Sequence, residues 1–175
     1  MTSKTIQKAF SYCPICQSNK LEFDQIKKYT CTACGWEFYQ NTAAAVACIV
    51  EKNGKVLVVE RNREPGKGMF DFPGGFVDPD ETAEEAALRE LKEELGIEPE
   101  NLRYLGSAPN HYVYKGIEYT TCDLFFVCEL KQPNLSLDIS EIASVHWLSA
   151  EDLDGEKFAF ESMRKALVLY RNQAI

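Results

Sequence analysis

The sequence predicts an α+β domain, an α-β-α sandwich in which helices cover both faces of a mixed β-sheet, preceded by a small cysteine-rich segment. Runs of β-branched and apolar residues alternate with two amphipathic stretches of helical period, as in a sheet packed between helices. Two Cys-x-x-Cys pairs fall within residues 1–40. The 175 residues are enough for one ordinary domain and a small appendage. We therefore expect two parts, residues 1–40 and residues 41–175.

Composition and charge limit the classes of partner. The formal net charge of −8 argues against indiscriminate nucleic-acid binding and leaves a specific nucleic-acid partner open. No stretch approaches the roughly 20 apolar residues of a membrane span, so we expect no membrane contact. The N-terminus lacks the apolar run of a signal peptide, and seven cysteines, an odd number, suit a reducing compartment better than a disulfide scaffold. These features predict a cytoplasmic protein.

The four cysteines of residues 1–40 have the spacing of a metal site. Cys13 and Cys16 form one pair and Cys31 and Cys34 the other, and two such pairs can surround one tetrahedral ion with four thiolates. The segment resembles a zinc ribbon, which implies structural Zn²⁺, although iron in a rubredoxin-like site uses the same ligands. Metal binding would supply the folding free energy of so short a segment. The ribbon either supports the fold or contacts a partner. Short strands are expected at Leu21–Asp24 and Lys28–Thr30.

Residues 42–60 predict a β-hairpin. Thr42–Val50 and Lys55–Glu60 are apolar and β-branched, and the Asn53-Gly54 pair between them is a strong hairpin-turn signal.

A basic, glycine-rich loop follows the hairpin. Arg61, Arg63 and Lys67 can reach a substrate phosphate from this loop, or they can be solvated side chains. The loop leads to Gly74 and Gly75, which allow the backbone to turn sharply and to approach an ion or ligand closely.

Residues 82–96 predict a helix with well-marked ends. Thr82 and Glu85 have the spacing of a capping box, and Gly96 lies where a helix usually stops. The apolar stripe expected to face the core consists of Ala83, Ala87, Leu88, Leu91 and Leu95.

Three carboxylates share another face of this helix. Glu90 and Glu94 are one turn apart and Glu93 lies beside them, a spacing at which like charges destabilise a helix by roughly 0.2–0.5 kcal/mol per pair. Such a cluster is relieved by solvent, as on any acidic face, or by a hard cation, and all-oxygen ligands favour Mg²⁺ or Mn²⁺.

The rest of the chain predicts further strands and a closing helix. Tyr119–Leu130 is almost continuously apolar, as in a central strand buried on both faces. Three cysteines, Cys48, Cys122 and Cys128, fall in apolar runs and are expected to be buried. The other predicted elements are strands at Leu102–Leu105, Tyr112–Tyr114 and Ala143–Leu148 and a helix at Phe158–Tyr170.

The stretch Gly75–Ile97 resembles the Nudix box. Gly75 is followed after five residues by Glu81, and after seven more by the run Arg89-Glu-Leu-x-Glu-Glu-x-Gly-Ile97, so every fixed position is filled. The resemblance implies a Nudix fold over residues 41–170. It also implies a Mg²⁺-dependent hydrolase in which water attacks a pyrophosphate that joins a nucleoside to another group X.

The resemblance assigns roles to individual residues. The catalytic base is at no fixed position in the family, so Glu90 and Glu141 are both candidates, and Glu141 can equally be a surface residue. Arg89 is expected to orient a glutamate, and Glu81 to be a supporting carboxylate. The implied metal ligands are Glu90, Glu93, Glu94 and the carbonyl of Gly74. Aromatic residues that can stack on a nucleobase, or simply belong to the core, are Phe70, Tyr112 and Tyr114.

The substrate is less sharply predicted. A zinc ribbon before a Nudix domain resembles the NADH pyrophosphatases, whose members also remove NAD caps from RNA, but their Ser-Gln-Pro-Trp-Pro-Phe-Pro signature is replaced here by Ser107-Ala-Pro-Asn-His-Tyr-Val. We therefore expect ADP-ribose or a related ADP-X first, NADH second, and dinucleoside polyphosphates or nucleoside triphosphates third. A non-catalytic nucleotide sensor is the alternative from another class. Nudix enzymes are often dimers, so a homodimer is possible.

Overall fold

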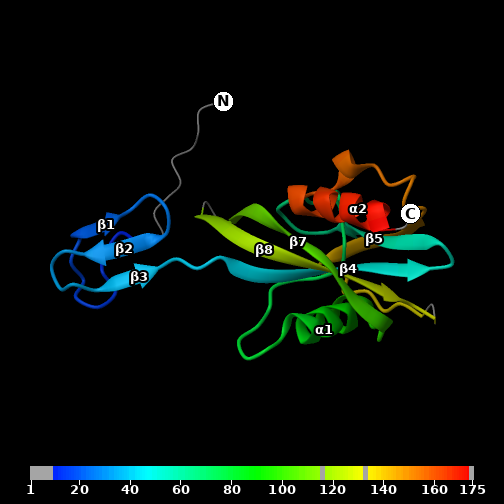
Figure 1. Ribbon diagram of the computed structural model, residues 1–175, viewed down its shortest axis with the longest axis horizontal. Coiled ribbons are helices and arrows are strands. Elements are labelled where there is room, and N and C mark those ends of the chain that lie inside the picture. The colour runs from blue at the N-terminus through cyan, green and yellow to red at the C-terminus, as the bar shows by residue number, and fades with distance from the viewer. Residues whose placement is uncertain (1–9, 115–116, 132–133, 174–175) are drawn as a thin grey trace. The chain divides into compact units, whose positions relative to one another are not determined.

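The computed structural model describes residues 10–114, 117–131 and 134–173, and the side chains of residues 114, 117 and 118 are outside this description (Figure 1). The chain divides into two compact units. Residues 1–42 together with 113–119 form the first, and residues 43–112 together with 120–175 form the second.

The first unit contains an antiparallel sheet in the order β1-β2-β3. The strands are β1 (Leu21–Phe23), β2 (Lys28–Cys31) and β3 (Glu37–Tyr39), of which only the first two were predicted. Tyr29 is 2% exposed, and the ring of Phe10 meets it edge-on at 5.4 Å between centroids. Aromatic rings packed against one another therefore supply the small apolar core of this unit.

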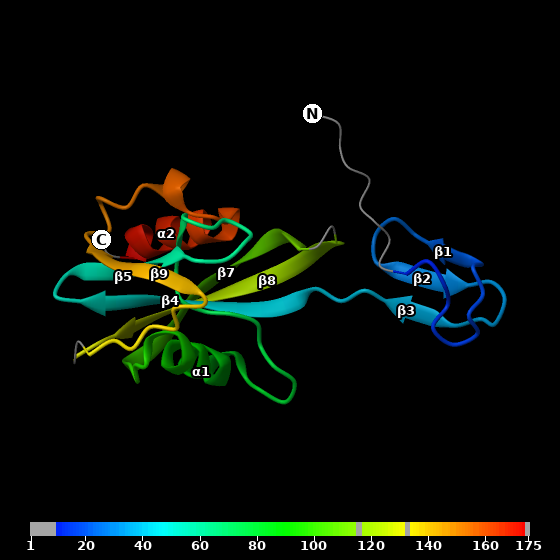
Figure 2. The same cartoon turned by 180° about the vertical axis from the view of Figure 1, so that it is seen from behind.

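The second unit is built on a six-stranded mixed sheet of order β6-β5-β4-β8-β7, with β9 paired to β5. The pairing of β4 with β8 is parallel, whereas β5 pairs antiparallel with β4, β6 and β9. Helix α1 covers one face of the sheet and α2 the other, which confirms the predicted sandwich (Figures 1 and 2). The elements are β4 (Ala43–Lys52), β5 (Lys55–Arg61), β6 (Phe70–Asp71), α1 (Ala83–Leu95), β7 (Glu100–Tyr114), β8 (Ile117–Glu129), β9 (Ile142–Leu148), the 3₁₀ turn η1 (Gly155–Lys157) and α2 (Glu161–Gln173).

The central strands are buried on both faces. Along β8, Phe126 packs with Leu91 and Leu95 of α1, while Phe125 packs with Leu167 of α2 on the opposite face. All five of these side chains are at most 2% exposed, as is expected where a strand lies between two helical layers. The prediction that this strand is central is confirmed.

The apolar stripe of α1 differs from the prediction at one position. Leu88 is 42% exposed, whereas Ala86 is completely buried. Ala86, Glu90 and Glu94 lie one turn apart in a row, so the buried face is rotated toward this row and away from Leu88. The rotation places two carboxylates against the sheet, which an apolar-periodicity argument cannot anticipate.

The burial of Cys122 was also predicted wrongly. Cys48 and Cys128 are buried, but Cys122 is exposed. Its register partner on β4, Ala44, is exposed too, so the helical cover of this face ends before this level of the sheet.

Two element boundaries also differ from the prediction. The two segments predicted around residues 102–105 and 112–114 are parts of the single strand β7. Pro109 does not interrupt it because β7 lies at the edge of the sheet, where a missing N–H is tolerated. The last helix begins at Glu161 rather than Phe158, since Phe158 is extended and its side chain is completely buried.

No helix among the described residues is both long and apolar enough to cross a membrane.

Candidate active site

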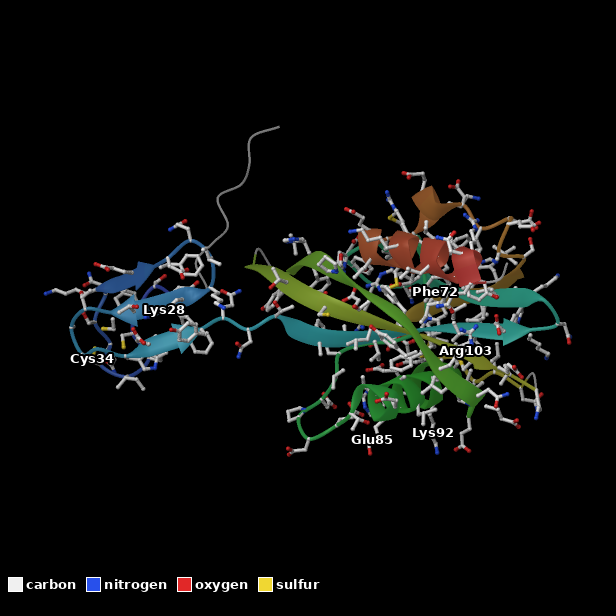
Figure 3. All side chains as sticks on the ribbon, in the orientation of Figure 1. Lys28, Cys34, Phe72, Glu85, Lys92 and Arg103 are labelled. Carbon is white, nitrogen blue, oxygen red and sulfur yellow. The ribbon has the colours of Figure 1, made fainter. Side chains whose placement is uncertain are left out.

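Local interactions fix both ends of α1 and thereby the direction of its carboxylates. The N–H of Glu85 donates to Thr82 Oγ1 at 3.2 Å, and the N–H of Thr82 donates to Glu85 Oε2 at 2.8 Å, which completes the predicted capping box. At the other end Gly96 adopts a left-handed conformation with φ 67°. Glu85 and Lys92 on α1 are labelled in Figure 3.

Glu94 is the most deeply placed carboxylate of the helix. It is 8% exposed, and its Oε2 accepts the N–H of Gly74 at 2.9 Å. The pKa of Glu94 is raised to about 8, first by burial and then by the negative charges of Glu90, Asp71 and Glu141, while the Gly74 N–H acts in the opposite direction. Among the described residues, no cationic side chain forms an ion pair with Glu94.

The two glycines before the box are required by close approach. A Cβ on Gly74, whose φ is 152°, would lie 2.1 Å from the carbonyl oxygen of Val46. A Cβ on Gly75 would lie 2.3 Å from Glu90 Oε1. The glycine pair therefore lies directly between strand β4 and the carboxylates of α1, and no larger residue fits there without displacing one of them.

Arg89 ties three glutamates together. Its Nε and Nη2 donate to the two oxygens of Glu81 at 2.8 and 3.0 Å, and its Nη1 donates to Glu90 at 2.8 Å and to Glu93 at 3.1 Å. Its Nη2 also donates to the carbonyl of Phe76 at 3.0 Å. The guanidinium holds the pKa of Glu81 below its ordinary value. This fork geometry orients the carboxylates while it offsets part of their charge.

Glu141, predicted as an alternative base, is brought to the same place from the loop before β9. Its negative charge contributes to raising the pKa of both Glu90 and Glu94, although burial is the larger cause for each. Its carboxylate forms an ion pair with Arg63 at 2.5 Å. The N–H of Asn62 donates to the Glu141 carbonyl at 2.7 Å and joins the basic loop to this one.

A cavity of about 110 Å³ opens on the α2 side of the glycine pair. Arg61 lines it, but its Nη1 is held by Asp71 at 2.6 Å and its guanidinium lies 4.9 Å from the ring centre of Phe160. Burial raises the pKa of Asp71 to about 6, against the opposing effect of Arg61. Arg61 and Arg63, the two arginines predicted to contact substrate, both line the cavity. Each already forms an ion pair with a carboxylate, Arg61 with Asp71 and Arg63 with Glu141.

The predicted aromatic residues are separated by the structure. Tyr112 lines the cavity, with Phe76 and Phe160 at 6.3 and 6.1 Å between ring centroids. Phe70 does not line it and packs instead against Phe158 at 6.3 Å. The side chain of Tyr114 lies outside the described residues.

Sequence reasoning missed several polar residues of the cavity wall, among them Thr121 and Asp123 of β8. They alternate on one face of β8, in a strand that is otherwise mostly apolar. Polar residues at i and i+2 in a buried strand were the available signal.

The cysteines of the first unit converge as their spacing predicts. The Sγ atoms of Cys13 and Cys34 are 3.7 Å apart, as are those of Cys16 and Cys31, and all four lie within 4.8 Å of one another. Tetrahedral Zn²⁺ with Zn–S bonds of about 2.3 Å requires sulfurs about 3.8 Å apart. The cluster therefore fits a four-thiolate metal site. Cys34 is labelled in Figure 3.

Comparison with known proteins places the second unit in a family. The family model described as "NUDIX domain" matches residues 40–169. A solved NUDIX hydrolase from Nitrosomonas europaea shares the fold, with a TM-score of 0.69 and 22% identity over 93% of this chain and 92% of that chain.

Two curated relatives carry functional names. An ADP-ribose pyrophosphatase of Methanocaldococcus jannaschii is 46% identical over 71 residues, which are 41% of this chain and 42% of that protein. The NAD-capped RNA hydrolase NudC of Vibrio vulnificus is 30% identical over 159 residues, which are 87% of this chain and 58% of that protein. The chain thus spans about half the length of these relatives.

Proposed function

The chain belongs to the Nudix family, and from that membership we propose that it is a divalent-metal-dependent pyrophosphohydrolase whose substrate is ADP-ribose or a related ADP-X. The observation that carries the proposal is the row of carboxylates on α1. Glu90 and Glu94 face the glycine pair, and the cavity opens on the other side of those glycines. A pyrophosphate at this boundary would have cation-binding oxygens on one side and room for a nucleoside on the other.

We propose that Glu90, Glu93, Glu94 and the carbonyl of Gly74 hold Mg²⁺ or Mn²⁺. The carbonyls of Pro73 and Gly75 accept N–H groups of β4, so in an extended chain the intervening N–H and carbonyl of Gly74 point to the opposite side. On that side the N–H of Gly74 donates to Glu94 Oε2 at 2.9 Å. A buried carboxylate with no cationic partner among the described residues is suited to a hard cation.

The reaction follows from how the chain holds these groups. The bound cations would neutralise charge on the pyrophosphate and lower the pKa of the attacking water. Arg89, fixed by Glu81, keeps Glu90 in place, and the Gly74 N–H does the same for Glu94. This rigidity holds the carboxylates in one geometry before substrate arrives.

Glu90 and Glu141 are the two candidates for the base that takes the proton of the water. Both are tied to an arginine, Glu90 to Arg89 at 2.8 Å and Glu141 to Arg63 at 2.5 Å. The pH–rate profiles of Glu90→Gln and Glu141→Gln separate them. Loss of the base removes the acidic limb of the profile, whereas loss of a supporting carboxylate lowers the rate at every pH.

The two curated relatives are named for different substrates, and each supports one substrate class for this chain. ADP-ribose is placed first because the match of 46% identity over 71 residues is to an ADP-ribose pyrophosphatase. NADH or an NAD-capped RNA is the alternative, supported by the longer match to NudC and by the cysteine cluster that precedes the Nudix domain. We further propose that this cluster holds structural Zn²⁺.

The experiment is a product assay with Mg²⁺ or Mn²⁺ on ADP-ribose, NADH, NAD⁺, diadenosine tetraphosphate and the nucleoside triphosphates. Glu94→Gln is the inactive comparison, and Glu84→Gln, an exposed residue of the same helix, is the matched control. We expect one substrate to be hydrolysed by the wild type and Glu84→Gln but not by Glu94→Gln. Metal-independent turnover, or equal turnover by Glu94→Gln, would contradict the proposal, and silence with every substrate would favour a nucleotide sensor.

A further inference from the structure

One carboxylate of the cavity wall, that of Asp123, has no cationic partner among the described residues. Asp123 is 3% exposed, and the hydroxyl of Thr121 donates to its Oδ1 at 2.6 Å. Within the described part of the chain, its Oδ2 accepts no hydrogen bond and no lysine, arginine or histidine lies within ion-pair distance. Because Asp123 lines the cavity, its carboxylate presents an acceptor to a group that enters there.

Asp71, on the same side of the sheet, shows the contrast. Its carboxylate accepts both the guanidinium of Arg61 at 2.6 Å and the N–H of Phe72 at 3.0 Å. In the described part of the chain, both oxygens of Asp71 therefore accept a hydrogen bond, whereas only Oδ1 of Asp123 does.

The strand register places Asp123 at a distance from the glutamates of α1. Asp123 pairs with Ala45 of β4, and Ala45 bridges to Phe76 on its other edge. With strands about 4.8 Å apart, the backbone of Asp123 lies about 10 Å from that of Phe76, which directly follows the glycine pair. Asp123 thus lies at the end of the cavity remote from the carboxylates proposed to bind metal.

The cavity wall also contains aromatic rings. Phe76, Tyr112 and Phe160 all line the cavity, and their rings are neighbours in that order. Such rings supply flat apolar surfaces for a planar group. The combination of aromatic faces with one buried acceptor is the chemistry that recognises a nucleobase by its edge.

We propose that Asp123 determines base specificity by accepting an N–H of the exocyclic amino group of the substrate's nucleobase. The inference rests on the proposed function, since it names which end of the nucleotide enters the cavity. An ionised carboxylate offers only acceptors, so it favours the amino groups of adenine, guanine and cytosine and repels a carbonyl at the same position. The hydroxyl groups of the ribose can also donate a hydrogen bond to a carboxylate, so the experiment distinguishes binding of the ribose from binding of the base.

The test measures nucleotide binding by calorimetry without added Mg²⁺, so that it does not depend on turnover. Two matched pairs differ only by an amino group: AMP with purine riboside 5′-monophosphate, and GMP with inosine 5′-monophosphate. In at least one pair we expect the amino-bearing nucleotide to bind the wild type at least about tenfold more tightly, as for one hydrogen bond to a charged group. The ratio should fall below about threefold in Asp123→Ala.

Controls keep the result specific to this carboxylate. Cys122→Ser changes the next residue of β8, which faces the opposite side and is exposed, and it should keep the wild-type ratio. If Asp123→Ala does not fold, as judged by circular dichroism, Asp123→Asn carries the test, because it replaces one acceptor by a donor at nearly constant volume.

Three outcomes would overturn the proposal. The first is equal binding within both pairs by the wild type, and the second is an unchanged ratio in the Asp123 variant. The third is that the wild type, but not the Asp123 variant, binds 2′,3′-dideoxy-AMP more weakly than AMP, while the amino group has no effect. The last would assign Asp123 to the ribose. If no substrate is hydrolysed but the amino-group ratio depends on Asp123, the proposed function fails while this inference stands.

Discussion

Replacing Glu94 by glutamine should change the pH dependence of stability as well as activity. In the metal-free protein the pKa of Glu94 is raised from 4.5 to about 8, with burial as the main cause. The folded state therefore holds the proton more tightly than the unfolded state does. Its contribution to stability is complete below about pH 4.5 and is lost as the pH rises through about 8.

The size of the effect follows from the shift. At 1.36 kcal/mol per pKa unit, ionising Glu94 in the folded protein costs at most about 5 kcal/mol, most of it between about pH 5 and about pH 8. Glutamine removes the charge and still accepts the N–H of Gly74 through its amide oxygen. Glu94→Gln should therefore be less sensitive to pH than the wild type and at least as stable at about pH 8.

The assay is urea unfolding of both proteins at several pH values in buffer passed over a chelating resin. EDTA is avoided because it would also remove the zinc that we propose for the cysteine cluster. Added Mg²⁺ should stabilise the wild type at about pH 8 more than the variant. Parallel pH curves for the two proteins would refute the assignment of the pH dependence to Glu94, and equal stabilisation by Mg²⁺ would refute its role as a ligand.

Three further substitutions test the rest of the site. Glu93→Gln should lower turnover at least about tenfold. It should leave the free energy of unfolding within about 0.5 kcal/mol of the wild type, because the Glu93 side chain is 62% exposed. A loss of turnover that is explained by a matching loss of folded protein would contradict a ligand role. Gly74→Ala should cost about 2–4 kcal/mol in urea unfolding because its Cβ would meet Val46, whereas Gly155→Ala, with no atom closer than 4.0 Å, should cost less than about 1 kcal/mol. Cys31→Ser should lower the zinc content measured by atomic absorption, and a wild type without zinc would refute the ribbon assignment.

The features that sequence predicted best are local ones. The capping box of α1, its glycine C-cap and the Asn53-Gly54 turn depend on residues within a few positions of one another, and the structure confirms all three. The spacing of the four cysteines likewise predicted their convergence, because the metal-binding pattern is itself a sequence pattern.

Features that depend on distant residues were not predictable in the same way. The rotation of α1 that exposes Leu88 buries Glu94, whose hydrogen-bond partner Gly74 lies in a loop 20 residues away in the sequence. Asp123 reaches the cavity only through the register of β8 with β4, and no short pattern encodes a parallel register. The position of Glu141 beside the α1 carboxylates was suggested by family resemblance alone.

The parallel partnership of β4 and β8 has a consequence for the order of folding. One edge of β4 closes early, because β5 follows across a tight turn, whereas the other edge pairs Ala43 with Thr121 and must wait until most of the domain has been synthesised. Closing so long a loop is slow, and an apolar strand with an open edge can meanwhile pair with another chain. Until β8 pairs with it, strand β4 therefore has an open edge through which the nascent protein can aggregate, and pairing with β8 covers that edge.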